Sequence, residues 1–430
     1  GITETIIRNL SRQQNLKVMA RSTTFRYKTK EVDARTVGKD LGVQAVLTGR
    51  VMQKGNDLLI TLELADARDN SYIWSNQYPG KINNLLSIQS NIANDISNKL
   101  SHGGKGITAE RSTDNVEAYN LYLKGRFFWN KRTKDGLEKA ITNFRQALDV
   151  DPSYALAWSG LADCYISQTF YEYSSPTEAM PLAKAAALKA LEIDESLAEA
   201  HITMAHVAVN FDWDWKAAEK EFKRGIALNP NYATGHQWYA IHYLMPIPRF
   251  NDALAELKEA QQLDPLSPLM TSFLGEALYF NRHYQEAEAE CRKALELEPN
   301  FPVAHWHLGL IYEQKGQYDQ AIEEHRKAVE LSGGSPRLIA ALGHAFAIAG
   351  KREEALHIIN QLKQREYVSP LEIASIHLAL GDQQNAFEFL EKAFNERSFH
   401  ITYLKIRPDF DSIRNDPRFG DLIRRIGLKI

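Results

Sequence analysis

FPVAHWHLGLIYEQKGQYDQAIEEHRKAVELSGG, residues 301–334, is the stretch that decides the fold. It contains two amphipathic helical patterns, the first with Gly309 and Tyr312, the second with Ala321 and Ala328, and a turn at Gly316 between them. A large side chain at Gly309, Ala321 or Ala328 would hold the two helix axes apart. Neither helix can bury its apolar stripe alone, so the stretch predicts a helical hairpin that needs a neighbouring hairpin.

The same pattern recurs at a constant interval along most of the chain. Gly275 and Ala287 precede Gly309 and Ala321 by 34 residues, and Ala253 precedes Ala287 by another 34. Eight units begin near Ala118, Ala155, Glu199, Thr234, Pro268, Pro302, Pro336 and Tyr367. This spacing resembles the tetratricopeptide repeat (TPR), which implies a mostly α-helical fold, a right-handed superhelix (α-solenoid) of stacked hairpins.

Composition excludes several classes of protein. The 51 basic and 54 acidic residues are mixed throughout and give a net charge of −3, so no basic stripe is present and nucleic acid is not expected as a direct partner. No run of 18 apolar residues occurs, so we expect no membrane insertion. Cys164 and Cys291 lie in different repeats, and we expect both to be small buried residues rather than a disulfide.

Residues 1–101 have a different pattern, typical of a small α+β domain. A period of two residues predicts a three-stranded meander with strands at 43–52, 58–64 and 72–78. Helical patterns surround it, at 2–10, 37–41 and 85–100, and a short strand is predicted at 16–20.

This region also resembles a known family. GITETIIRNLS, VMARSTTFRYK, VGKDLGVQAVLTGRV, LITLELADARDNSYIWSNQY and LLSIQSNIANDIS are similar to the TolB-N/FlgO-like domain of bacterial multidomain signalling proteins, which often precedes TPR repeats. In that family a further strand normally comes first, so we expect the domain to be truncated and the chain to be a piece of a longer protein. The predicted organisation is a TolB-N/FlgO-like domain (1–101), a Gly-rich linker (102–113), eight repeats (114–397) and a C-terminal capping segment (398–430).

The first two repeats are longer between their helices than the others, and the second is the longest. About nine residues, 170–178, are inserted between the two helices of the second unit, and they begin with the aromatic sequence FYEY. This loop is expected either to pack on the flank of the domain or to contact a partner.

No catalytic constellation is found in the sequence. Nucleophile elbows, zinc-protease and kinase motifs and paired Cys-x-x-Cys are all missing, and His305 and His307 point to different sides of one helix, so they cannot share a metal. We therefore predict no enzymatic activity for this chain, with no catalytic residues, no metal and no cofactor.

The candidate binding site is the concave face. In the TPR family, positions 2, 5, 9 and 12 of each first helix line this groove, and aromatic side chains there are candidate anchors for a peptide or helix. On this chain the resemblance gives the candidates Tyr122, Arg126, Trp129, Trp238, His242, Tyr279, Trp306, Glu313 and His344. The Lys and Asn set of the TPR carboxylate clamp is missing, so an amphipathic segment is expected rather than an anionic tail.

These observations leave three functional hypotheses. The first is a non-catalytic protein-interaction scaffold or sensor module of a bacterial signalling protein, with a protein or peptide ligand. The second rests on residues 121–165, which resemble the region after the catalytic domain of some bacterial serine/threonine kinases. Similar regions follow adenylate cyclase or winged-helix DNA-binding domains. The chain would then be the regulatory C-terminal region of such a kinase, cyclase or winged-helix regulator. The third is a self-assembling scaffold, a homo-oligomer. The compartment, cytoplasmic or periplasmic, cannot be read from these residues.

Overall fold

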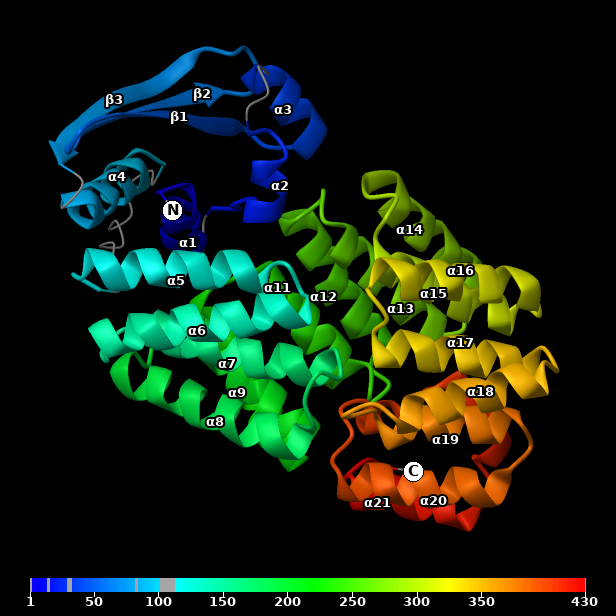
Figure 1. Cartoon of the computed structure of the whole chain (residues 1–430). Coiled ribbons are helices and arrows are strands. Elements are labelled where there is room, and N and C mark those ends of the chain that lie inside the picture. The colour runs from blue at the N-terminus through cyan, green and yellow to red at the C-terminus, as the bar shows by residue number, and fades with distance from the viewer. Residues whose placement is uncertain (1, 14–15, 29–32, 82–83, 101–112, 430) are drawn as a thin grey trace.

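The computed structural model describes residues 2–13, 16–28, 33–81, 84–100 and 113–429, which form a small α+β domain docked on a helical solenoid (Figure 1). The mostly α-helical fold class predicted from the sequence is confirmed. The predicted linker at 102–113 lies, except for Thr113, outside the described residues.

The N-terminal domain is a meander with helices on one face. Its strands, in the order β1-β2-β3, are antiparallel and span Ala45–Lys54, Asp57–Asp66 and Tyr72–Lys81. The helices α1 (Ile2–Ser11) and α4 (Leu85–Leu100) cover one face of the sheet, where Ile60, Ile92 and Ile96 are almost completely buried. A third helix, α3 (Ala34–Leu41), ends at Gly42, whose φ of 67° is a left-handed conformation that glycine adopts without strain.

The solenoid consists of helical hairpins. In the described residues eight hairpins follow one another: α5 (Val116–Trp129) with α6 (Lys134–Val150), α7 (Ala155–Phe170) with α8 (Pro176–Ile193), α9 (Ala198–Val207) with α10 (Trp215–Leu228), α11 (Ala233–Trp238) with α12 (Phe250–Leu263), α13 (Pro268–Phe280) with α14 (Tyr284–Leu297), α15 (Pro302–Gln314) with α16 (Tyr318–Leu331), α17 (Pro336–Ile348) with α18 (Arg352–Lys363), and α19 (Pro370–Ala379) with α20 (Gln383–Asn395). Cys164 and Cys291 are both free and buried within it.

Two of the first helices end in π-helical turns that the repeat pattern did not predict. The helix starts at Ala198, Ala233 and Pro268 are 35 residues apart, whereas those at Pro268, Pro302 and Pro336 are 34 apart. The π-helices η2 (Ala208–Asp212) and η3 (Tyr239–Leu244) lie in the two longer units. A π-turn takes one extra residue without breaking the helix, so it absorbs the difference in length.

The C-terminal residues do more than cover the last hairpin. The helix α21 (Pro417–Arg425) is capped by the Asp416 side chain and packs Phe419 and Leu422 against α20. Residues 398–413, which we call the C-terminal strap, contain the 3₁₀-helices η4 (Ile401–Tyr403) and η5 (Pro408–Ile413) and run along the concave face of the solenoid.

The N-terminal domain is attached to the solenoid through α1 and through its residues 16–26. Residues 16–20 form no strand, contrary to the prediction, because their backbone groups bond to the solenoid instead: Val18 N–H donates to Asn231 and Ala20 N–H to the Leu263 carbonyl. The short helix α2 (Arg21–Phe25) follows, and Asp264 accepts hydrogen bonds from the Thr23 backbone (3.1 Å) and hydroxyl (2.7 Å). Figure 1 shows α2 beside α12.

None of the helices in the described ranges combines the length and the apolar character needed to traverse a lipid bilayer.

Gly309 allows the close helix contact that the repeat pattern requires. A Cβ added there would lie 2.6 Å from His325 Nδ1 in the paired helix, so we expect Gly309→Ala to lower the free energy of unfolding by about 1–3 kcal/mol. Gln320→Ala, on the exposed face of α16, is the control and should change it by less than about 0.5 kcal/mol. Urea unfolding followed by circular dichroism measures both, and equal effects would contradict the packing described for Gly309.

Asp264 is the central acceptor of the contact between the two parts of the chain. Because Asp264→Ala leaves the buried Thr23 donors without their partner, we expect it to cost about 1–3 kcal/mol of unfolding free energy. Asp252→Ala removes an exposed ion pair with Arg249 and should cost less than about 1 kcal/mol. A loss for Asp264→Ala no greater than that for the control would show that the contact does not stabilise the protein.

Candidate functional site

The C-terminal strap divides the concave groove and covers part of the predicted site. Phe399 of the strap lies against His206 and His242, with ring centroids 5.1 Å and 5.6 Å away, and Trp238 packs on the same His206 ring at 4.9 Å. Of the predicted anchors, His242 therefore packs on the chain's own Phe399, and the half-buried Trp238 packs on His206 beside it.

A second predicted group is covered by the middle of the strap. The Tyr403 hydroxyl donates to the Ile241 carbonyl, and Arg407 donates two hydrogen bonds to Glu372, at 2.9 Å and 3.0 Å. Next to these contacts only a small space of about 40 Å³ remains, and Tyr279, Glu313 and His344 line it. These three predicted residues have no open groove in front of them.

Glu313 and His344 belong to a buried hydrogen-bonded chain. The Glu313 carboxylate accepts from His325 Nε2 and from His344 Nδ1, each at 3.0 Å, and its side chain is 1% exposed. Burial disfavours the carboxylate, but the charge of His344 and the two hydrogen bonds outweigh it and hold the pKa of Glu313 at about 2. Burial likewise disfavours the charged form of His344, yet Glu313 raises its pKa.

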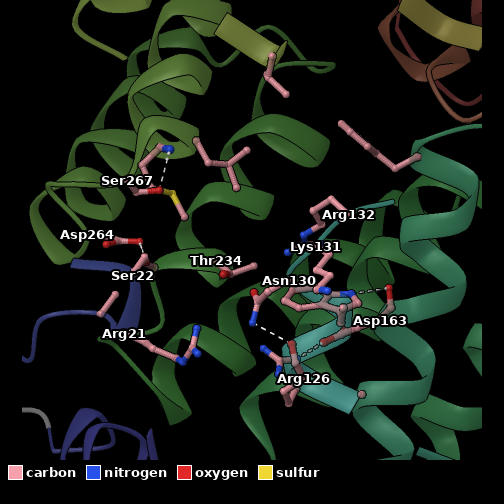
Figure 2. A pocket seen from close by; sticks show the side chains of 18 of the residues that line it. Arg21, Ser22, Arg126, Asn130, Lys131, Arg132, Asp163, Thr234, Asp264 and Ser267 are labelled. Atoms are coloured by element: carbon pink, nitrogen blue, oxygen red, sulfur yellow. Dashed lines mark hydrogen bonds and ion pairs between the residues drawn. The ribbon is translucent and has the colours of Figure 1, made fainter. Parts of the chain in front are cut away.

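The remaining predicted residues open on a chamber of about 620 Å³. Tyr122, Arg126, Trp129 and Trp306 line it from the concave helices, and residues of α2 line it from the N-terminal domain. Figure 2 shows Ser22 and Asp264 on one side, Arg126 and Asp163 on the other, and Thr234 between them. The chamber is therefore built jointly by the two parts of the chain.

Charged and aromatic side chains interleave on the α5 side of the chamber. Arg126 pairs with Asp163 at 3.1 Å, and the guanidinium groups of Arg126 and Arg132 lie 4.3 Å and 3.4 Å from the Trp129 ring. The indole N–H of Trp129 donates to the Ser167 hydroxyl at 3.0 Å. Burial disfavours the charge of Arg126, but Tyr122 and Asp163 hold its pKa above the ordinary value.

The inserted FYEY loop packs inside the molecule, between the strap and the chamber. Phe170 meets the Phe399 and His400 rings edge-on, while Tyr171 and Tyr173 line the chamber. Between them Glu172 accepts a hydrogen bond from the Ser369 backbone at 3.2 Å, and burial, reinforced by the negative charge of Glu372, raises its pKa to about 7.

Several lining residues are not among the candidates named above. Arg21 and Ser22 come from the other domain, and Arg132 lies in the α5–α6 turn with a φ of 55°, so none of them belongs to a helical stripe. Arg337 occupies the second position of α17, which is a groove position, and its guanidinium lies 4.3 Å from the Trp306 ring. Arg337 thus belongs to the stripe that the repeat pattern assigns to the groove, whereas the other three residues required the tertiary structure.

Comparison with known families identifies the repeats. Residues 130–195, 248–302 and 274–336 match the tetratricopeptide repeat, and residues 371–398 match a second model with the same description. Residues 1–95 match the second domain of the HilA/YgeH-like transcriptional regulators, and not the TolB-N/FlgO-like domain predicted from the sequence. The chain thus contains TPR repeats, preceded by a domain similar to the second domain of the HilA/YgeH-like regulators.

Two curated relatives have related sequences. Putative adenylate cyclase 3 of Rhizobium meliloti (strain 1021) is 28% identical over 210 residues, which are 48% of this chain and 36% of that protein. Transcriptional regulator HilA of Salmonella typhimurium (strain LT2) is 24% identical over 225 residues, 51% of this chain and 39% of that protein. The chain thus matches less than two fifths of the length of either relative.

A solved structure shares the fold. The human IFIT1 dimer with PPP-AAAA superposes with a TM-score of 0.50 at 16% identity, covering 72% of this chain and 78% of that one. At this identity the likeness concerns the fold alone.

The buried Glu313–His344 pair makes stability depend on pH. Because the pKa of Glu313 is lowered, its contribution to the free energy of unfolding is complete above the unfolded pKa of 4.5 and is lost as the pH falls toward 2. Because the pKa of His344 is raised, its contribution is complete below the unfolded pKa of 6.5 and is lost at higher pH. We expect Glu313→Gln to lower the free energy of unfolding by about 3 kcal/mol at pH 6 and by less at pH 9.

Urea unfolding at the two pH values measures this difference. Glu323→Gln, on the exposed surface of α16, is the control and should show little effect at either pH. An equal loss for Glu313→Gln at pH 6 and pH 9 would contradict the pairing with a charged histidine.

Proposed function

We propose that this chain is a protein-interaction module of a bacterial signalling protein, and that its chamber receives a short segment of a partner protein. One observation carries the proposal: the chamber is walled by the concave helices on one side and by α2 of the N-terminal domain on the other (Figure 2). A bound segment would contact both parts of the chain and stabilise their arrangement. The TPR repeats support a protein as the partner.

The size and lining of the chamber support a short ligand. Its volume of about 620 Å³ lies within the roughly 300–1,000 Å³ of pockets that enclose small ligands. Trp129, Trp306 and Tyr122 supply aromatic surface of the kind that dominates binding energy at interfaces. Because the strap covers His242 and Tyr279, we propose insertion of a few residues rather than a helix lying along the whole groove.

Catalysis is not part of the proposal. Within the described ranges, no group of three His, Cys, Asp or Glu side chains is arranged to hold a metal ion. That the chain performs no chemistry of its own stays a prediction.

We also propose that the module regulates an effector domain in a longer protein. The similarity to a putative adenylate cyclase and to HilA supports a cyclase or a DNA-binding domain as the effector. The coding sequence upstream of Gly1 tests this: a cyclase domain or a basic recognition helix is the expected finding, and a serine/threonine kinase domain would show that the effector is a kinase instead.

Selection of a displayed peptide library on the immobilised chain tests the chamber. Thr234→Trp places an indole in the middle of the chamber, where space is available, so the protein should remain folded. Because the indole occupies the space of the ligand, the affinity for the selected peptides should fall by about tenfold or more. Lys220→Trp adds the same side chain on the exposed surface of α10 and should leave the affinity unchanged. Fluorescence anisotropy of labelled peptides gives the dissociation constants.

Equal affinity for the wild type and both variants would remove the chamber from the proposal. Circular dichroism and urea unfolding of Thr234→Trp establish that a lost affinity is not lost folding.

A further inference from the structure

Two guanidinium groups at the chamber have no carboxylate partner among the described residues. Arg132 donates to the Ser167 hydroxyl at 3.2 Å and lies over the Trp129 ring, but no described Asp or Glu is within ion-pair distance. Arg337 donates to His400 Nε2 at 2.9 Å and lies over the Trp306 ring. Its Nε has no hydrogen-bond partner in the part of the chain that the structure describes, although the residue is only 7% exposed. Both residues line the same chamber.

Tyr171, from the inserted loop, connects the two. The positive charges of Arg132 and Arg337 both act on its hydroxyl, although burial raises its pKa overall, and no described residue hydrogen-bonds to that hydroxyl. Burial lowers the pKa of both arginines, which means that their charge is poorly solvated where it stands. Glu372, Glu172 and Glu276 act on Arg337, and Asp163 on Arg132, from beyond ion-pair distance. An anion placed between the two arginines would add a counter-charge in direct contact with them.

We infer that the chamber recognises a single anionic group, a carboxylate or a phosphate, through Arg132, Arg337 and the Tyr171 hydroxyl. The inference rests on the proposed function, since it names the chemistry of the group that enters the same chamber. Arginine suits this role because its planar fork can donate two parallel hydrogen bonds to such an anion.

The rest of the lining limits how much negative charge can enter. Arg126 and Arg21 are already paired, with Asp163 at 3.1 Å and Glu4 at 3.5 Å. Glu199 also lines the chamber, and its Oε2 has no described partner. One anionic group with an aromatic or apolar neighbour therefore fits better than a polyanion, which would be repelled by Glu199.

This site differs from the carboxylate clamp that the sequence lacks. Arg132 lies in a turn and Arg337 at the second position of a helix, whereas the clamp uses positions 5 and 9 of successive first helices. The expectation of an amphipathic segment rather than an anionic tail rests on those helix positions alone, whereas the site proposed here uses residues of a turn, of the insertion and of the first turn of a helix.

Titration with small aromatic anions tests the inference. Phenyl phosphate and benzoate are the two anionic probes, and benzyl alcohol is the neutral probe; isothermal titration calorimetry at constant ionic strength measures binding to the full chain. We expect at least one anion to bind about tenfold or more tightly than benzyl alcohol, as the loss of a charge-assisted hydrogen bond implies. The better anion tells whether phosphate or carboxylate is preferred.

Variants locate the bound anion. Arg132→Gln should lower the affinity for the anion about tenfold and leave the affinity for benzyl alcohol unchanged. Arg132→Lys should retain part of the affinity for the anion. Lys134→Gln changes an exposed residue two positions away and outside the chamber, and it should have no effect. Equal affinity of the three probes, or an anion affinity that Arg132→Gln does not change, would overturn the inference. If Arg132→Gln does not fold, the comparison of the anionic probes with benzyl alcohol on the wild-type chain still tests the inference.

The two proposals fail in different ways. If neutral peptides bind, if Thr234→Trp abolishes their binding and if no anion competes with them for the chamber, the anionic specificity is wrong and the peptide function stands. If the anions bind through Arg132 and no peptide is selected, the peptide function is wrong and the chamber is a site for a small anion. Binding of a single-stranded RNA oligonucleotide that Arg132→Gln abolishes would contradict the preference for a single anionic group.

Discussion

The packing of the C-terminal strap into the concave groove is the contact on which the shape of this solenoid depends. In an ordinary repeat array each unit touches only its neighbours, and stability is a sum of local terms. Here Tyr403 bonds to Ile241 of the fourth hairpin and Arg407 to Glu372 of the eighth, so a single short segment holds distant repeats at a fixed separation. The same segment decides which part of the groove stays open.

The N-terminal domain makes a second long-range connection. Thr23 and Asp264 are 241 residues apart in sequence, and their hydrogen bonds place α2 over the concave face, where it becomes one wall of the chamber. Trp215 adds a third connection, because its indole N–H donates to the Ile426 carbonyl at 2.9 Å. With these connections, repeats far apart in sequence should unfold together rather than one after another.

The sequence predicted those features that depend on local spacing. The hairpins follow from small residues such as Gly309 at a regular interval, and the meander from its two-residue period. The π-turns could not be predicted, because one extra residue in a helix has no sequence signal of its own. It becomes visible only when the starting residues of successive helices are compared. The strap has no periodicity, so the repeat pattern placed His242, Tyr279, Glu313 and His344 in an open groove that the strap covers. Tyr122, Arg126, Trp129 and Trp306 line the open chamber, but Arg132 was missed because it lies in a turn.

The strap also fixes how many repeats this protein can carry. In an open array, duplication or deletion of one unit merely lengthens or shortens the rod, and such arrays change length readily during evolution. Loss of a unit between the fourth and eighth hairpins would move Glu372 relative to Ile241, so that one strap could no longer reach both. We therefore expect natural variation in this architecture to occur by substitution within units, with the number of hairpins inherited as a whole.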